Sequence, residues 1–306
     1  MTHLRAPGTL SVLAVAVLAV LAGPAASGQP GMAAPAFDGS RAYEHVRRLV
    51  EIGPRPAGSE GIARARQYIT AEIAGLGLKV VEQAFDADTP LGRIPMVNLS
   101  ITIAGERSDR LIIAGHYDTK LFRHFRFVGA NDGGSSAGFL IELARVLKDR
   151  RNPFTIELVF FDGEEAVVAW TGTDHTYGSR EYVAAARRQG TLAGVKAMLL
   201  VDMIGDRQLQ IRREAASTPW LTEAIWASAR KLGHAAVFVN DSLQIEDDHL
   251  HFLAAGIPAV DLIDLDYQAW HTEADTLDHI AAESLQTVAD VLLDALPVIE
   301  ARLRSR

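Results

Sequence analysis

The segment TIELVFFDGEE, residues 155–165, contains the clearest fold signal in the sequence. Its first seven residues are mostly β-branched, aliphatic or aromatic, which predicts a buried strand over 155–161. Three carboxylates follow that strand at once, Asp162, Glu164 and Glu165. Because ligands of open α/β sheets bind beyond the carboxyl ends of the strands, these acidic side chains are the first candidates for a functional site.

Apolar runs on both sides of this segment alternate with helical patterns. Strands are expected at 79–85, 97–103, 111–114, 198–201 and 259–263, and helices at 41–52, 61–76, 139–147, 180–187, 221–232 and 281–303. Strands that alternate with helices are typical of an α/β protein with a parallel sheet. We therefore predict an α/β sandwich with a mainly parallel central sheet.

The composition narrows the class of protein further. The 306 residues are 48% hydrophobic and 22% charged, as expected of a globular chain. Lys and Arg number 30 against 38 Asp and Glu, and the resulting net charge of −8 disfavours a nucleic-acid binder. The sequence contains no Cys, which excludes disulfides, thiolate metal sites and a cysteine nucleophile. Any metal must therefore be held by His, Asp and Glu.

The first 27 residues have the pattern of a secretory signal peptide. Arg5 precedes an apolar run at 10–21, and small residues follow at 23–27. The run is shorter than the about 20 residues that a membrane-spanning helix needs, so an uncleaved anchor is the less favoured interpretation. Residues 28–40 are rich in Gly, Pro and Ala and predict a linker, and residues 41–306 predict one domain. We expect a secreted or periplasmic protein without a stable membrane partner, with the monomer as the favoured oligomeric state.

Side chains of the types that bind metals recur just after the expected strands or where a loop meets a helix. Each alone has an ordinary explanation, since Asp often caps helices and stabilises turns. Together they are typical of a catalytic zinc site, which takes about three protein ligands and leaves one position open. The candidates are His116, Asp118, Asp132, Glu164, Glu165, Asp202 and His271.

Two pairs among these candidates suggest a division of roles. Asp118 lies two residues after His116 in an extended segment, so the two side chains point to the same side. Asp118 could therefore hydrogen-bond to a metal-binding His116 and orient its imidazole without itself binding the metal. Glu164 and Glu165 are adjacent, so one could bind a metal while the other acts as general base or acid.

Six motifs occur along the chain in an order and spacing that are more specific than any motif alone. They are VEIGPRPAGSEG (50–61), GHYDTK (115–120), GANDGGSSAGFLIELARVL (129–147), LVFFDGEEA (158–166), LLVDMIG (199–205) and WHTEADTLDHI (270–280). This set resembles a family of zinc-dependent exopeptidases that contains bacterial secreted aminopeptidases and the glutaminyl-peptide cyclotransferases. The resemblance implies a three-layer α/β sandwich whose mixed, mainly parallel central sheet is flanked by helices.

The resemblance also implies metal ligands by position. The residues that match the ligands of one zinc ion are Asp132, Glu165 and His271. Glu164 matches the general acid/base. In aminopeptidases, His116 and Asp202 would hold a second zinc ion, with Asp132 as the bridging ligand. The implied cofactor is therefore Zn²⁺, with one ion per chain in a cyclotransferase and two in an aminopeptidase.

Further segments resemble the cyclotransferase branch of the family. They are FFDGEEAVVAWTGTDHTYGSRE (160–181), EDDH (246–249) and the pair WH at 270–271. The aromatic residues that would wall a pocket for an N-terminal glutamine are Trp170, Trp270 and Tyr267. Asp247 would help to orient the reacting groups, and Asp202 would belong to an acidic network near the metal. The chain departs from the animal cyclotransferases at Asp261, where they carry a histidine.

These patterns predict a zinc enzyme that acts on the amino termini of peptides or proteins. The favoured activity is that of a glutaminyl-peptide cyclotransferase, in which the α-amine of an N-terminal glutamine attacks its own γ-carbonyl and ammonia leaves. The alternative is a secreted zinc aminopeptidase, in which Glu164 would instead activate a water molecule. A non-catalytic ectodomain on the same fold is the third interpretation, and the complete set of candidate ligands disfavours it.

Overall fold

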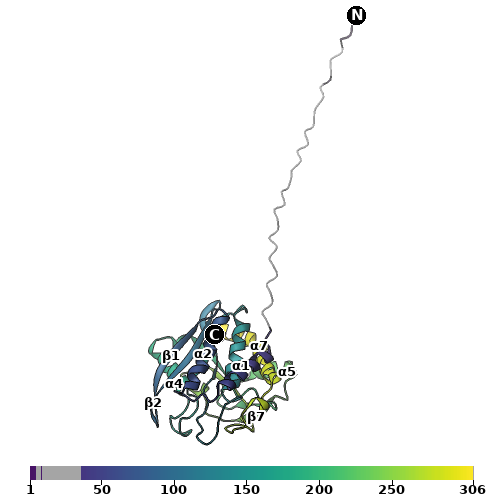
Figure 1. Ribbon diagram of the computed structural model, residues 1–306. Coiled ribbons are helices and arrows are strands. Elements are labelled where there is room, and N and C mark those ends of the chain that lie inside the picture. The colour runs from purple at the N-terminus through teal and green to yellow at the C-terminus, as the bar shows by residue number, and fades with distance from the viewer. Residues whose placement is uncertain (5–7, 9–35, 306) are drawn as a thin grey trace. The chain divides into compact units, whose positions relative to one another are not determined.

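Six strands form one sheet that is parallel on one side and antiparallel on the other (Figure 1). In spatial order they are β1 (Val80–Thr89), β2 (Gly92–Ile103), β4 (Phe154–Phe161), β3 (Arg107–His116), β5 (Val195–Asp202) and β8 (Ala259–Ile263). The pairs β4–β3, β3–β5 and β5–β8 are parallel, whereas β1–β2 and β2–β4 are antiparallel. The predicted mixed, mainly parallel sheet is confirmed.

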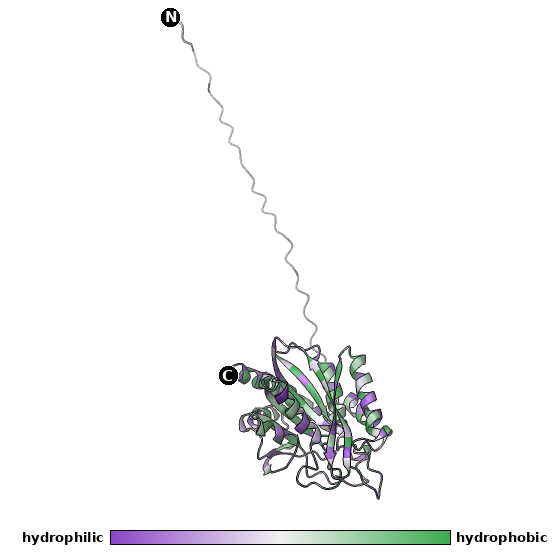
Figure 2. Ribbon diagram, turned by 90° about the vertical axis from the view of Figure 1, so that its left-hand side faces the viewer, coloured by the Kyte–Doolittle hydropathy of each residue, from purple (hydrophilic) through white to green (hydrophobic). Residues whose placement is uncertain are grey.

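The strands present alternate residues to helices on opposite faces of the sheet. In β3, Leu111 and Ile113 face one apolar core, while Ile112 and Ala114 face the other. The first core includes residues of α1 (Gly39–Ile52), α2 (Glu60–Gly75), α3 (Gly134–Leu147), α5 (Pro219–Lys231) and α7 (Ala282–Arg304), and the second those of α4 (Tyr177–Arg188) and α6 (His249–Ala254). Figure 2 shows the apolar strands between helices, which is the predicted three-layer sandwich.

The computed structural model describes residues 1–4, 8 and 36–305. Most of the predicted signal peptide (1–27) and linker (28–40) therefore lies outside the described residues. The last part of that linker is a wrong prediction, because Phe37 is buried and its ring centroid lies 5.1 Å from that of Phe139. Asp38 then caps α1, since its side chain accepts hydrogen bonds from the backbone N–H groups of Ser40 and Arg41. The folded domain thus begins before residue 41.

Short elements complete the fold. The strands β6 (Ile211–Glu214) and β7 (Phe238–Leu243) form a separate parallel pair that the sequence pattern does not predict. Two 3₁₀ turns, η1 (Leu192–Gly194) and η2 (Leu277–His279), precede β5 and α7. Among the described residues, no helix combines the length and apolar character that a membrane crossing requires.

Candidate active site

The candidate side chains gather where the parallel strands end. His116 is the last residue of β3 and Asp202 the last of β5, while Glu164 and Glu165 follow β4. His271 comes from the loop after β8. The carboxyl ends of neighbouring parallel strands meet at one edge of a sheet, and the structure brings these residues together there, as expected.

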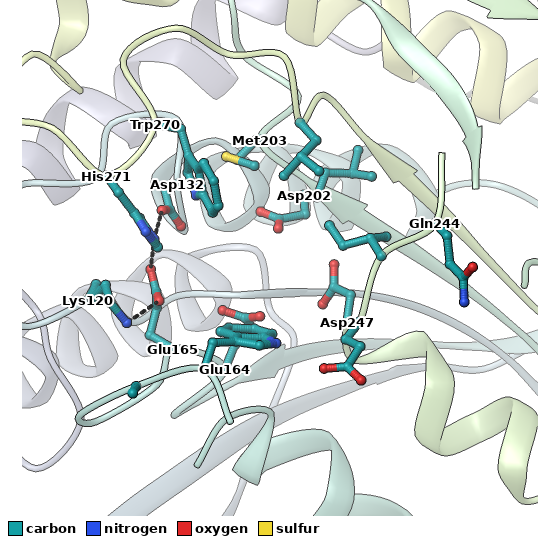
Figure 3. A pocket seen from close by; sticks show the side chains of 16 residues that line it. Lys120, Asp132, Glu164, Glu165, Asp202, Met203, Gln244, Asp247, Trp270 and His271 are labelled. Carbon is teal, nitrogen blue, oxygen red and sulfur yellow. Dashed lines mark hydrogen bonds and ion pairs between the residues drawn. The ribbon is translucent and has the colours of Figure 1, made fainter. Parts of the chain in front are cut away.

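Three side chains form a first group that could hold a metal ion. Nε2 of His271 lies 3.0 Å from Oε1 of Glu165 and 3.3 Å from Oδ2 of Asp132 (Figure 3). Their ligand atoms all lie within 4.8 Å of one another. Oδ2 of Asp132 and Oε2 of Glu165 are buried without a hydrogen-bond partner among the described residues. One imidazole and two carboxylates with unsatisfied oxygens fit a zinc ion, which accepts nitrogen and oxygen ligands.

A second group shares Asp132 with the first. Nε2 of His116 lies 3.2 Å from Oδ1 of Asp202 and 3.3 Å from Oδ1 of Asp132. These three residues also satisfy the geometry for holding a metal ion. Asp132 therefore lies between two imidazoles, at the position that a bridging ligand would take.

Asp118 lies behind both groups. Its Oδ1 is 3.3 Å from Nδ1 of His116, which is the orienting contact that the spacing predicts. The same carboxylate accepts hydrogen bonds from the backbone N–H groups of Glu164 and Glu165, at 3.2 and 3.3 Å. Asp118 is thus in a position to fix both the imidazole and the turn that carries the adjacent glutamates.

Asp132 is held from its backbone side by Asp275. The Asp275 carboxylate accepts hydrogen bonds from the N–H groups of Asn131 and Asp132, at 2.8 and 3.1 Å. The next residue, Gly133, has φ = 73° and begins the turn into α3. A Cβ atom at Gly133 would lie 2.2 Å from the carbonyl oxygen of Asp118, so this position requires glycine.

Tyr267 does not line the pocket, so its predicted role as a pocket aromatic is wrong. Its side chain is buried, and its hydroxyl donates a hydrogen bond of 2.8 Å to Oδ1 of Asp275. Tyr267 therefore supports the backbone of Asp132 through Asp275. The sequence indicates an aromatic residue near the site, but the direction of a side chain in an irregular loop depends on the tertiary structure.

A cavity of about 410 Å³ lies in front of the metal-binding groups. Its acidic and basic lining residues are Lys120, Asp132, Glu164, Glu165, Asp202, Glu246, Asp247 and His271, and its apolar wall includes Trp170, Met203, Ile245, Ile263, Leu265 and Trp270. Figure 3 shows Asp202 and Asp247 on the side of the cavity away from His271 and Lys120. An acidic cavity with an apolar wall suits an amino group that is attached to a small side chain.

Trp170 and Trp270 contribute their indole rings to the cavity wall. Trp270 is 42% exposed, and its ring stacks on that of His271 with ring centroids 4.4 Å apart. The ring of Trp170 stacks on His175 at the same centroid distance. The loop that carries Trp170 is fixed by Asp174, whose carboxylate accepts hydrogen bonds from the N–H groups of residues 167–169.

The protonation equilibria of the site reflect its burial and its many charges. Burial raises the pKa of Glu164 well above the usual glutamate value; His116 opposes this shift, whereas Asp247 adds to it. Burial alone would lower the pKa of His271, but its interactions with Asp132 and Glu165 raise it to about 9. A carboxyl group with a raised pKa beside a cavity is typical of a general acid or base.

Several further residues contact this site. Nζ of Lys120 lies 3.5 Å from Oε2 of Glu165, and the rings of Phe122 and Phe127 contact His271 edge-on. Lys120 and Asp275 lie inside two of the motifs quoted above, and that position is the only sequence signal for them. Their contacts depend on how separate loops meet.

The fold and the site together define a metal-dependent α/β enzyme whose active site lies at the carboxyl ends of the strands. The family model described as Peptidase family M28 matches residues 98–296. The chain belongs to peptidase family M28.

Similar proteins give a finer comparison. The chain is 31% identical over 284 residues to the glutaminyl-peptide cyclotransferase of Boiga irregularis, with 80% of this chain and 76% of that protein covered. It is 32% identical over 285 residues to the glutaminyl-peptide cyclotransferase of Bos taurus, with 80% and 78% covered. The crystal structure of an Acidobacteriales bacterium glutaminyl cyclase has a TM-score of 0.84 and 38% identity, and the match covers 92% of this chain and 99% of that one.

Proposed function

We propose that this chain is a zinc-dependent glutaminyl-peptide cyclotransferase, which converts the N-terminal glutamine of peptides and proteins to pyroglutamate and releases ammonia. The proposal depends mainly on one observation: Glu164 lines the same cavity as both metal-binding groups but belongs to neither of them. Its carboxylate is therefore free to carry protons. The similarity to proteins that are named glutaminyl-peptide cyclotransferases and glutaminyl cyclases supports this choice of substrate.

In this proposal Asp132, Glu165 and His271 hold the zinc ion of the reaction. When bound, zinc supplies a Lewis acid that polarises the γ-carbonyl of the substrate glutamine. Lys120 is the cation beside this group and lies close to Glu165. It therefore compensates part of the negative charge of the ligand set.

The remaining chemistry is an intramolecular proton and acyl transfer. The substrate α-nitrogen forms a bond to the γ-carbon, and the bond between that carbon and the side-chain nitrogen breaks. Glu164 takes a proton from the attacking amine and returns one to the leaving nitrogen, which departs as ammonia. No other reactant is consumed.

The cavity walls have to fold the glutamine side chain back on its own amino group. Trp170 and Trp270 supply rigid apolar surfaces for this purpose, and a near-attack geometry accounts for a large part of the rate of such a reaction. Asp247 faces the cavity and is the proposed partner of the substrate amino group. Asp202 lines the same cavity and adds a second carboxylate to its acidic surface beside Asp247.

A zinc aminopeptidase is the second candidate, because the group of His116, Asp132 and Asp202 could hold a second metal ion. In that reaction Glu164 would take a proton from water, and the water would attack the first peptide carbonyl. Zinc content separates the two proposals: about one ion per chain is expected of the cyclotransferase and about two of the aminopeptidase.

The test is to incubate the purified, zinc-loaded protein with one peptide that begins with glutamine and one that begins with leucine. Mass spectrometry should show that the first peptide loses one ammonia without becoming shorter, while the second stays intact. Release of free leucine from the second peptide, with the first unchanged, would reject the cyclotransferase in favour of the aminopeptidase. A glutamine peptide with an acetylated amino group is the control and should not react.

We also propose export of the protein through the signal peptide at residues 1–27, with secretion or periplasmic location as the result. Its partners are then the amino termini of extracytoplasmic peptides. Amino-terminal sequencing of protein recovered from outside the cytoplasm should find a start near residue 28. Recovery of the intact chain with Met1 would contradict cleavage.

A further inference from the structure

One wall of the cavity is carried by an exposed loop. Trp170 lines the cavity and is half-buried, whereas its neighbours at 168, 169 and 171–173 are exposed. The Asp174 carboxylate fixes the backbone N–H groups of residues 167–169, but these hydrogen bonds end one residue before Trp170 and involve no atom of its indole. The position of the indole therefore depends on contacts of the ring itself.

The imidazole of His175 supplies such a contact. The two rings are stacked, with centroids 4.4 Å apart and an interplanar angle of 10°. Among the described residues, His175 contributes the only aromatic ring that contacts the Trp170 indole. Because the imidazole covers one face of the indole, the indole cannot tilt towards that side. The proposed reaction gives His175 no other role.

His175 is itself held by hydrogen bonds. Its Nδ1 lies 3.1 Å from the hydroxyl oxygen of Thr176, and that oxygen lies 2.8 Å from Nε2 of His251 on α6. A hydroxyl group can donate one hydrogen bond and accept others, so it can satisfy both imidazoles in this arrangement. The side chain of His175 is only 12% exposed. The indole is thus connected to α6 through two imidazoles and one hydroxyl group.

Glu164, the proposed proton carrier, is anchored to the same loop by other atoms. The backbone N–H of Thr176 donates a hydrogen bond of 2.7 Å to the carbonyl oxygen of Glu164, and that of Tyr177 donates one of 2.8 Å to Gly163. Neither bond involves the side chain of His175. Loss of the imidazole should therefore free the indole and leave Glu164 in place.

We propose that His175 is a positioning residue for substrate binding: its imidazole holds the indole of Trp170 in the orientation that forms the cavity wall for the substrate glutamine. Without the imidazole the indole samples other orientations, and only a fraction of the molecules presents the complete wall. The apparent affinity for the peptide falls by that fraction, while the bound complex, in which the wall is in place, reacts at nearly the normal rate. This inference rests on the proposed cyclotransferase function.

The first test measures the kinetics of the zinc-loaded wild type, His175→Ala and His175→Phe on a peptide that begins with glutamine. A stacked aromatic pair contributes a factor of about 2–12 to an equilibrium constant, so the KM of His175→Ala should rise by about fivefold while kcat stays within about twofold. His175→Phe keeps a ring on the indole but loses the bond to Thr176, and it should restore most of the wild-type KM. His45→Ala is the control and should leave KM unchanged, because His45 is bonded to Tyr68 and neither residue lines the cavity.

A double-mutant cycle tests whether His175 acts through the indole. In the background of Trp170→Ala, the further change His175→Ala should not alter KM, because no indole is left to position. An increase of about fivefold in this background as well would overturn the inference, since His175 would then act without Trp170. A lower kcat at constant KM in His175→Ala would also overturn it, because the effect would then lie in the reaction step and not in binding.

The second readout needs neither zinc nor turnover. The fluorescence of Trp170 is the difference between each protein and its Trp170→Phe counterpart, which removes the contribution of the other tryptophans. Acrylamide should quench this fluorescence more strongly in His175→Ala than in the wild type, because the imidazole no longer covers the indole, and His175→Phe should restore the wild-type quenching. Equal quenching in wild type and His175→Ala would overturn the inference. If the wild type does not cyclise the peptide but the quenching differs as expected, the proposed function fails while the positioning of the indole by His175 stands.

Discussion

At the scale of single residues, the adjacent Glu164 and Glu165 differ because their surroundings differ. The Glu165 carboxylate lies 3.0 Å from the imidazole of His271 and 3.5 Å from the Lys120 ammonium, so it is paired on both sides. The Glu164 carboxyl group faces the cavity among other acidic groups, and burial raises its pKa. The backbone N–H groups of both residues donate to Asp118, which fixes the turn that carries them.

The residues behind Asp132 give a prediction about metal affinity. Tyr267→Phe removes only the hydroxyl that donates to Asp275, and Asp275 in turn holds the N–H group of Asp132. Loss of an outer contact of this kind typically weakens metal binding by about 10–100-fold, so zinc affinity should fall by about tenfold. Competition with a chelator measures it. Tyr68→Phe is the control, and an unchanged affinity in Tyr267→Phe would show that this support is dispensable.

Some candidate ligands could be predicted because they stand at the ends of apolar runs that form strands: His116 and Asp202 end β3 and β5, and Glu165 closely follows β4. Asp132 lies just before α3 and His271 in the loop after β8, so these two are indicated by the motifs that contain them. The role of Tyr267 could not be predicted, because its direction is set by the contact with Asp275 and not by local periodicity.

At the scale of elements, the central strands were predictable because they are covered on both faces. All eight residues of β4 are buried and all but Thr155 and Glu157 are apolar, so the apolar run is easy to recognise. In contrast, most residues of β7 are exposed or half-buried, and polar residues occupy its middle, so no strand pattern is visible there. The hairpin β1–β2 extends to Thr89 and Gly92, beyond the predicted strand ends. The sequence pattern does not reveal this extension, because the residues at the tip of the hairpin are mostly exposed and polar.

The start of α1 gives a prediction about stability. Phe37 is 5% exposed and packs on Phe139 of α3, so it anchors the chain just before the helix. Phe37→Ala should lower the free energy of unfolding by about 3 kcal/mol, the usual size for loss of a buried aromatic ring. Urea unfolding measures the change.

The matched control for this variant is Val298→Ala, because Val298 is 55% exposed on α7. It should change the free energy of unfolding by less than about 0.5 kcal/mol. If Phe37→Ala has an effect as small as this control, the segment before α1 is not part of the folded core.

At the scale of the whole molecule, the acidic site should make stability depend on pH and on zinc. In the metal-free protein, burial raises the pKa of Asp247, Asp264 and Asp275 to about 7. The folded chain then binds more protons than the unfolded chain between about pH 4 and pH 7, so stability falls as the pH rises through this window. His271, with its pKa raised to about 9, adds stability that is lost as the pH rises from about 6.5 through 9.

Thermal unfolding with a chelator should therefore give a lower melting temperature at about pH 8 than at about pH 5.5. Zinc should raise the melting temperature most at the higher pH, because it binds the ionised carboxylates and the neutral imidazole. A melting temperature that rises with pH in the chelator would contradict this account of the buried carboxyl groups.

The central claim is that Glu164 moves the proton while Glu165 binds the metal, and one pair of variants tests it most directly. Glu164→Gln should keep about the wild-type zinc content and lose at least about a hundredfold in kcat on a glutamine peptide. Glu165→Gln should lose both zinc and turnover. Zinc content and ammonia release measured on the same preparations decide the matter: wild-type turnover in Glu164→Gln would contradict the claim.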